Sequence, residues 1–337
     1  MEYRNLGNSG LKVSPICLGT MMFGDRTDAA EAGRIVASAR AAGVNFIDTA
    51  DAYAKGESER ITGKLIAAER EQWVLATKLG NFMGKGPNDG GLSRAWMMRA
   101  VDASLERLNT DWIDIYYFHR DDASTPLEES LTAMAEIIAA GKVRYFGISN
   151  YRAWRIAQVA ELCAKLGVPA PIVSQPYYNA MNRMPETEVL PACANYGLGV
   201  VPYSPLARGV LTGKYAPGQT PAADTRAGKN DKRMMETEFR EESMVMAQAL
   251  KAHAEKRGMS AGQFALNWVL NNRLVTSVLA GPRTMEQWTE YLGALEHLFS
   301  AEDEALVDSM VKSGHPSTPG FNDPKYPLTG RPTCHVR

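Results

Sequence analysis

The chain has 337 residues, of which 45% are hydrophobic and 22% charged, and its formal net charge is −1. This balance excludes the strong field that binding to nucleic acid or anionic lipid requires, and no apolar run reaches the roughly 18 residues of a membrane span. The N-terminus lacks the apolar core of a signal peptide. The cysteines are widely spaced, without a CxxC pair, at Cys17, Cys163, Cys193 and Cys334. We therefore expect a cytoplasmic protein with neither a nucleic-acid nor a membrane partner.

A β-hairpin is predicted first, because residues 2–6 and 11–15 flank the turn sequence Gly-Asn-Ser-Gly. Short apolar runs then alternate with longer segments of helical period. The expected strands are 15–19, 45–48, 73–78, 112–119, 143–149, 171–175, 198–204 and 276–281. The expected helices are 29–43, 57–69, 94–108, 127–141, 151–167, 186–197, 242–258, 260–272 and 284–298. Glycines stand where helix C-caps belong, at Gly43, Gly141, Gly167, Gly197 and Gly258.

Alternating strands and helices indicate βαβ units and a parallel sheet, and the number of strands favours a closed (β/α)8 TIM barrel. No G-x-G-x-x-G follows the first expected strand, which argues against an open dinucleotide-binding sheet. We expect one domain over 1–337, with long loops at the C-terminal face. The polar segment 207–240 interrupts the alternation, and a loop of that length is usually functional or disordered. The tail from Gly314 onward, rich in Pro and Gly, is expected to lie extended on the surface.

Reactive side chains follow three neighbouring strands, at the end where TIM barrels build their active sites. Asp48 ends the second expected strand and Tyr53 lies in the loop behind it. Lys78 ends the third strand and His119 the fourth. Each also has an ordinary structural explanation when it is considered alone: Asp48 as a helix cap, Tyr53 as a packed ring, Lys78 as a surface charge and His119 as a structural imidazole. Their common location predicts a functional site.

These four side chains suit the protonation of a carbonyl oxygen. A phenol has a pKa of about 10, and a nearby ammonium lowers it by favouring the phenolate. A carboxylate would keep that ammonium charged, and a neutral imidazole could orient the carbonyl. There is no H-E-x-x-H, no G-x-S-x-G and no pattern of metal ligands. The attacking species must therefore come from outside the chain, and a hydride from a nicotinamide fits.

The chain resembles the aldo-keto reductases, bacterial members in particular, essentially from end to end. The motifs that carry the resemblance are "GTMMFG", "DTADAYAKGESE", "ATK", "YYFHRDD", "VRYFGISN", "SQPYYN", "PYSPLARGVLTGKY" and "AGPRTMEQ". The resemblance implies NADPH-dependent reduction of aldehydes or ketones to alcohols. It also implies a catalytic tetrad of Asp48, Tyr53, Lys78 and His119, with Tyr53 as the general acid.

Cofactor contacts are implied by the same motifs. Ser149, Asn150 and Gln175 are expected to hold the nicotinamide carboxamide, and Tyr203 to stack on its ring. The residues expected along the pyrophosphate are Ser204, Pro205, Leu206, Arg208 and Gly209. Those expected at the adenosine end are Ala280, Gly281, Arg283, Gln287 and Tyr291. Segment 207–240 is expected to fold over the cofactor.

Two departures from the family pattern concern the adenosine end. The usual "PGA" reads "AGP" at 280–282, and Tyr291 replaces a frequent Asn. Arg283 precedes an expected helix, whose N-terminus favours an anion, and its guanidinium could bind the ribose phosphate in bidentate fashion. We therefore predict that Arg283 selects NADPH over NADH.

Two alternatives remain open at this stage. Potassium-channel β subunits are similar to aldo-keto reductases and keep cofactor and tetrad, although they usually carry an N-terminal extension before the hairpin. A metal-dependent sugar isomerase on the same barrel would need clustered His and carboxylate ligands. The partner is expected to be a small carbonyl compound of unknown identity, and the oligomeric state is open. Substrate specificity is expected to come from the loops after the first, third, fourth and seventh expected strands and from the tail. The candidate substrate-lining residues are Met21, Met22, Phe23, Phe82, Trp96 and Tyr151.

Overall fold

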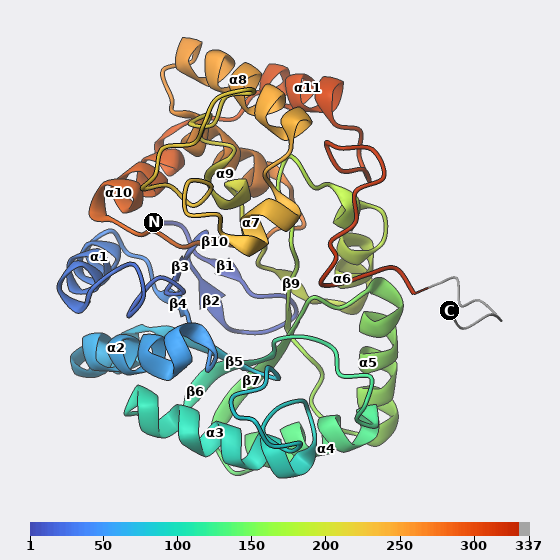
Figure 1. Cartoon of the computed structure of the whole chain (residues 1–337). Coiled ribbons are helices and arrows are strands. Elements are labelled where there is room, and N and C mark those ends of the chain that lie inside the picture. The colour runs from blue at the N-terminus through green and yellow to red at the C-terminus, as the bar shows by residue number, and fades with distance from the viewer. Residues whose placement is uncertain (330–337) are drawn as a thin grey trace.

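A computed structural model describes residues 1–329 and shows a (β/α)8 TIM barrel (Figure 1). The eight strands are parallel and lie in the order β10-β3-β4-β5-β6-β7-β8-β9. The sheet closes between its edge strands, because the Thr276 amide donates to the Val200 carbonyl at 2.9 Å and that of Leu279 to Pro202 at 3.0 Å. The strands are β3 (Ile16–Gly19), β4 (Phe46–Asp48), β5 (Val74–Leu79), β6 (Ile113–Phe118), β7 (Val143–Ser149), β8 (Val173–Gln175), β9 (Gly199–Val200) and β10 (Val278–Ala280).

Helices surround these strands in Figure 1, and every expected helix is present. They are α1 (Ala29–Ala41), α2 (Glu57–Ile66), α3 (Arg94–Leu108), α4 (Leu127–Ala139), α5 (Ala153–Leu166), α6 (Val189–Tyr196), α8 (Glu241–Lys256), α9 (Ala261–Asn271) and α10 (Met285–Gly293). Gly167 and Gly197 are left-handed C-caps, as expected. Two further helices were not predicted, α7 (Lys232–Thr237) and α11 (Ala301–Met310). The first is short, and the second buries little more than Asp303 and Val307, so neither has a strong apolar period.

Alternation along the strands separates two cores. Inward-facing side chains such as Phe46, Val74 and Ile115 fill the barrel, whereas Ile47 and Leu75, one position along, pack beneath the helices. The successive inward residues form layers, as expected for this architecture. Polar groups on inward positions at the strand ends must therefore meet at the barrel mouth.

The predicted hairpin closes the other end of the barrel. It consists of β1 (Arg4–Asn5) and β2 (Lys12–Val13), which pair antiparallel. Its Leu6 and Val13 are fully buried against the bottom layer of the interior. Gly7 has a φ of +58°, and a Cβ there would lie 2.4 Å from the Ile172 carbonyl oxygen, so only glycine permits this approach.

The long segment 207–240 is ordered against the barrel. Leu211 and Met234 are fully buried, and α7 lies in front of the strand ends in Figure 1. The tail is also packed rather than merely extended, because the Ser317 amide donates to the Met181 carbonyl at 2.8 Å. Cys334 lies outside the described residues. Within 1–329, no helix has the length and apolarity that a membrane span needs.

Candidate active site

The upper layer of the barrel interior holds an ion pair. Phe46 on β4 and Ala76 on β5 face the barrel interior. Asp48 and Lys78 stand two positions after them and therefore face inward too, and both side chains are fully buried. The Lys78 ammonium donates to the Asp48 carboxylate, and also to the Thr49 carbonyl at 2.8 Å. Period-two alternation thus places both groups at the mouth of the barrel.

The loop after β4 turns Tyr53 back toward this pair. Ala54 and Lys55 have φ values of +46° and +56°, followed by Gly56 at +91°. Left-handed conformations cost energy for residues other than glycine, and they often occur at functional sites. Ser58 holds the turn in place, because its hydroxyl donates to the Thr20 carbonyl at 2.8 Å.

The four expected tetrad residues come together in space. The Lys78 ammonium donates to the Tyr53 hydroxyl at 3.3 Å, and the ring of His119 lies edge-on to that of Tyr53 with 5.9 Å between centroids. The Asn81 amide group donates to Nδ1 of His119 at 3.0 Å. Nδ1 is therefore the acceptor, and the ring proton lies on Nε2.

Burial and the ion pair set the protonation states. Burial alone would lower the pKa of Lys78, but the charge and hydrogen bonds of Asp48 and Tyr53 together outweigh it, so the pKa is raised and the ammonium stays charged. Burial, reinforced by Lys78, lowers the pKa of His119 well below its usual range and keeps the imidazole neutral. Burial raises the pKa of Tyr53, and Lys78 opposes only part of this rise. The expected net lowering of the Tyr53 pKa is thus wrong, because desolvation exceeds the effect of the ammonium.

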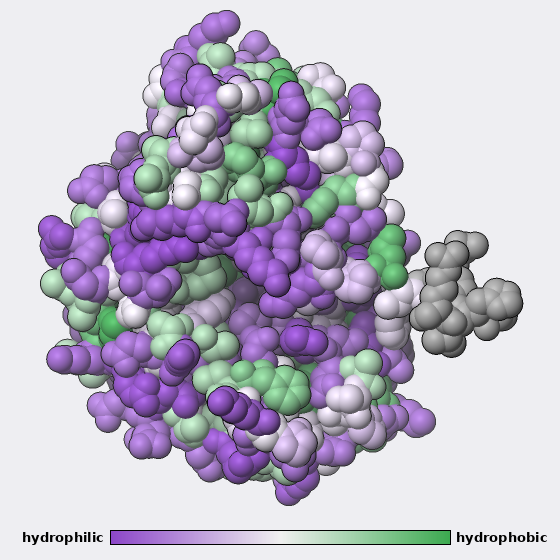
Figure 2. Space-filling model, in the orientation of Figure 1, coloured by the Kyte–Doolittle hydropathy of each residue, from purple (hydrophilic) through white to green (hydrophobic). Residues whose placement is uncertain are grey.

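A cavity of about 690 Å³ opens above this group, and Figure 2 shows the hollowed face bordered by hydrophilic residues. Asp48, Tyr53 and His119 line it, and Lys78 lies buried behind them. Every residue expected to contact the cofactor also lines it: Ser149, Asn150, Gln175, Tyr203, Ser204, Pro205, Leu206, Arg208, Gly209, Ala280, Gly281, Arg283, Gln287 and Tyr291. One continuous cavity therefore joins Asp48, Tyr53 and His119 to the expected cofactor residues.

Hydrogen bonds hold the amide-bearing side chains near the tetrad. The Gln175 amide donates to Asp48 at 3.1 Å, and the Tyr203 hydroxyl donates to the Asn150 side-chain oxygen at 2.7 Å. The ring of Tyr203 stacks on Tyr177 with centroids 5.6 Å apart. These contacts fix the orientation of flat polar groups that could border a carboxamide and a ring.

The other end of the cavity is cationic. Arg283 lies directly before Thr284, which caps α10, and its backbone amide donates to Gln287 at 2.8 Å. Within residues 1–329, Arg208, Lys214 and Arg283 form no ion pair with a carboxylate. Cationic side chains without a carboxylate partner, one of them beside a helix N-terminus, suit an anionic ligand such as a phosphate.

The long segment covers this end of the cavity. The Arg283 guanidinium donates to the Asp224 carbonyl at 3.4 Å, and Asp231 accepts from Arg26 at 3.2 Å. Asp231 therefore ties the segment to the loop after β3, and Arg226 lines the cavity beneath it.

Sequence reasoning missed several lining residues, namely Arg26, Asn81, Lys214, Arg226, Arg233, Lys325 and Tyr326. Asn81 comes three residues after Lys78 and could have been found from that spacing. The tail residues Lys325 and Tyr326 stand in no sequence pattern that would place them at the cavity. Of the expected substrate-lining residues, only Met21 and Met22 border the cavity. Phe23 and Tyr151 are core residues, Trp96 packs on the core, and Phe82 points to solvent.

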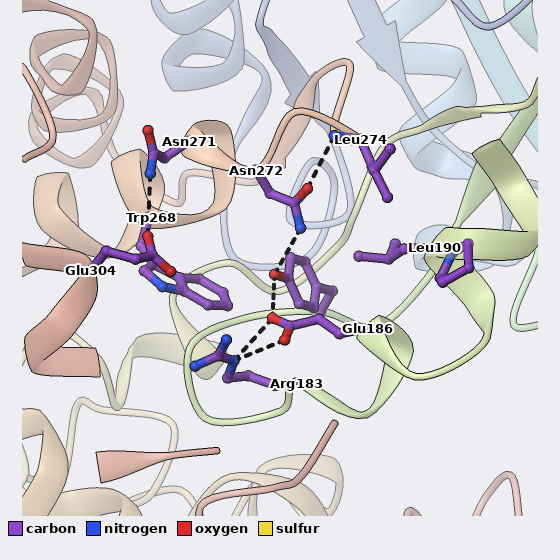
Figure 3. A pocket seen from close by; sticks show the side chains of 10 residues that line it. Arg183, Glu186, Leu190, Trp268, Asn271, Asn272, Leu274 and Glu304 are labelled. Carbon is purple, nitrogen blue, oxygen red and sulfur yellow. Dashed lines mark hydrogen bonds and ion pairs between the residues drawn. The ribbon is translucent and has the colours of Figure 1, made fainter. Parts of the chain in front are cut away.

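A second cavity, of about 270 Å³, lies outside the barrel among α6, α9 and α11 (Figure 3). Most of its polar side chains bond to one another, whereas the indole N–H of Trp268 has no hydrogen-bond partner among residues 1–329. Tyr178 donates to Glu186 at 2.7 Å, Arg183 donates to the same carboxylate at 2.9 Å, and Asn271 donates to Glu304 at 3.2 Å. It lies away from the tetrad and holds no comparable set of reactive groups.

Comparison with known proteins agrees with this geometry. Residues 15–312 match the model of the aldo/keto reductase family. A rice protein named "probable voltage-gated potassium channel subunit beta" is 39% identical over 93% of this chain and 97% of its own. An L-glyceraldehyde 3-phosphate reductase of Escherichia coli O157:H7 is 35% identical over 93% of both chains. An uncharacterized oxidoreductase of Bacillus subtilis is 36% identical over 95% of this chain and 98% of its own. The chain therefore belongs to the aldo/keto reductase family of oxidoreductases, which use a nicotinamide cofactor.

Proposed function

We propose that the protein reduces aldehydes or ketones to alcohols with NADPH, and that Tyr53 is the general acid. The observation that carries this proposal is the contact between Lys78 and the Tyr53 hydroxyl at the floor of the large cavity. A neutral phenol beside a fixed ammonium can give up its proton as negative charge develops on a substrate oxygen.

The side chains divide this work among them. Tyr53 donates its proton to the carbonyl oxygen, and the Lys78 ammonium stabilises the phenolate left behind. Asp48 keeps Lys78 charged and in place. His119 directs its Nε2 proton toward the same oxygen, since Asn81 occupies Nδ1. The nicotinamide, when bound, supplies the hydride that the chain itself lacks.

The cavity fits a dinucleotide. Asn150 and Gln175 stand near the tetrad with amide groups suited to a carboxamide, and Tyr203 presents a ring beside them. Arg208 and Lys214 provide charge for the pyrophosphate, and Arg283 provides it for the additional phosphate that distinguishes NADPH from NADH. The support for NADPH is the Arg283 guanidinium beside the N-terminus of α10, which forms no ion pair with a carboxylate among residues 1–329.

A second candidate is a cofactor-binding subunit of a potassium channel. It is favoured by the similarity to the rice protein of that printed name. The two roles differ in what the isolated chain does, because a regulatory subunit needs its partner whereas an enzyme turns over alone. The similarity to the E. coli reductase favours the enzyme.

A panel of aliphatic, aromatic and phosphorylated aldehydes and simple ketones, followed by loss of NADPH absorbance, tests the proposal directly. We expect the isolated protein to turn over with NADPH. This rate should exceed the rate with NADH when the two cofactors are supplied at the same subsaturating concentration. Absence of turnover across the panel, with NADPH shown to bind by calorimetry, would favour the regulatory role. Turnover that is equal with both cofactors would retain the reductase and refute the selection by Arg283.

A further inference from the structure

The C-terminal tail places Lys325 at the reactive end of the cavity. Lys325 and Tyr326 line the cavity together with Tyr53 and His119. Lys325 is near enough to His119 that its charge helps to lower the pKa of the imidazole, after the larger effects of burial and Lys78. More than 200 residues of sequence separate the two, so only the fold brings them together.

The tail is fixed by several contacts around this lysine. Arg233 of α7 binds both carboxylate oxygens of Asp323, at 2.9 and 2.6 Å. Arg152, before α5, donates to the Tyr326 carbonyl at 2.7 Å. The guanidinium of Arg240 lies 3.8 Å from the ring centre of Phe321. Lys325 therefore stands on an anchored segment with a defined position.

Lys325 has no acidic partner among residues 1–329, although Asp323 lies two positions before it. That carboxylate is occupied by Arg233 and by the Lys325 backbone amide. The surrounding charges are mainly positive: partial burial, then Arg233 and Arg120, lower the pKa of Lys325. A cation held among other cations beside a reactive centre is available to an anion from outside the chain.

The ribose phosphate expected at Arg283 does not account for this lysine. Arg283 follows β10, whereas His119 follows β6, and these strands are the first and fifth in a closed ring of eight, so they lie on opposite sides of the barrel. In Figure 1 the red tail and α10 likewise lie on opposite sides of the central strands. Arg283 is thus separate from the cation beside His119, whereas Arg208 lies close enough to Lys325 for its charge to lower the pKa of that lysine.

We propose that the substrate is a small carbonyl compound that carries a carboxylate or phosphate group, which Lys325 binds while the carbonyl oxygen lies at Tyr53 and His119. This inference rests on the proposed reductase function and names its substrate class. Because Lys325 is only partly buried and remains open to solvent, we expect a contribution at the lower end of the range for charged hydrogen bonds, about tenfold in affinity.

Matched aldehydes test the inference. Succinic semialdehyde is compared with butanal, and glyceraldehyde 3-phosphate with glyceraldehyde, in the wild type, Lys325→Met, Lys325→Arg and Lys165→Met. In Lys325→Met we expect KM to rise about tenfold for the anionic aldehyde relative to its neutral partner. Lys325→Arg should restore most of the preference, and Lys165→Met, at an exposed position on α5, should keep that of the wild type. A loss confined to one anionic aldehyde would show whether the carboxylate or the phosphate is recognised.

The inference is overturned if Lys325→Met leaves unchanged the ratio of the KM for the anionic aldehyde to the KM for its neutral partner. It is equally overturned if this variant binds NADPH more weakly while that ratio stays the same. Calorimetric binding of the same aldehydes to protein saturated with NADP+ gives the comparison without turnover. Anion-selective binding that depends on Lys325 but leads to no reaction would thus contradict the reductase and keep the anionic ligand. Turnover of neutral and anionic aldehydes with equal KM would support the reductase and contradict the anionic substrate.

Discussion

The two cavities differ in what their polar side chains already bond. In the outer cavity, Arg183, Glu186 and Glu304 all have partners within the lining (Figure 3). In the barrel mouth, the cations Arg208 and Lys214 have no carboxylate partner among the described residues. Satisfied polar groups stabilise a fold, whereas groups left available can bind a ligand. Volume and unused bonding capacity thus point to the same cavity, and the bonding capacity also indicates the charge of the ligand it could bind.

Among the substitutions compared, the largest effect is expected when one hydroxyl is removed at the barrel mouth. Tyr53→Phe keeps the ring but removes the proton that the proposed mechanism uses. General acid catalysis is worth about 10²–10⁴-fold, so we expect a loss of that order in single-turnover hydride transfer, with NADPH affinity nearly unchanged. Retention of more than about half of the wild-type rate would assign the acid to another group.

A carboxylate below the mouth offers a test by pH. Within residues 1–329 neither carboxylate oxygen of buried Asp51 has a hydrogen-bond partner, and burial together with nearby Glu59 raises its pKa from 3.8 to about 7. The folded protein thus holds this proton more tightly than the unfolded chain, and stability falls as pH rises from about 4 to about 7. At about 1.4 kcal/mol per unit, the fall is on the order of 4 kcal/mol.

Asp51→Asn should remove this part of the pH dependence. We expect its free energy of unfolding by urea, relative to the wild type, to improve steadily from about pH 4 to about 7 and then level off. Asp111→Asn, at an exposed position, provides the control. A difference between Asp51→Asn and the wild type that does not vary with pH would mean that Asp51 is not the titrating group.

At the far end of the same cavity, Arg283→Ala should weaken NADPH binding and leave NADH binding nearly unchanged. Loss of a charged hydrogen bond costs roughly 1.5–3 kcal/mol, or about ten- to a hundredfold in affinity. Titration of both cofactors by calorimetry measures this selectivity. Arg273→Ala removes an exposed arginine and should change neither affinity. Equal weakening of both cofactors would show that Arg283 does not recognise the ribose phosphate.

The smallest effect should come from the matching hydroxyl in the outer cavity. Tyr178→Phe removes the donor to Glu186 and the acceptor for Asn272. We expect a loss of about 1 kcal/mol in the free energy of unfolding and no change in turnover. Urea unfolding and the aldehyde assay measure the two effects. A substantial loss of turnover would refute the distinction between a structural and a reactive cavity.

Much of the site followed from local sequence. Asp48 and Lys78 end neighbouring expected strands, and this predicted a common location, because parallel barrel strands end at the same face. The spacing from Asp48 to Tyr53 placed the phenol in the following loop. These are properties of a few neighbouring residues, so they could be read from the chain before its fold was known.

Other features were decided by tertiary structure alone. Whether the pKa of Tyr53 rises or falls depends on how burial compares with the charge of Lys78, and sequence gives neither quantity. Phe23 and Trp96 were expected to face substrate, yet their hydrophobic character serves the core equally well. Lys325 had no local pattern, since its place beside His119 depends on the anchoring of the tail by distant arginines. Periodicity is local, but burial and proximity arise from contacts between residues far apart in the chain, and these determine the chemistry of the barrel mouth.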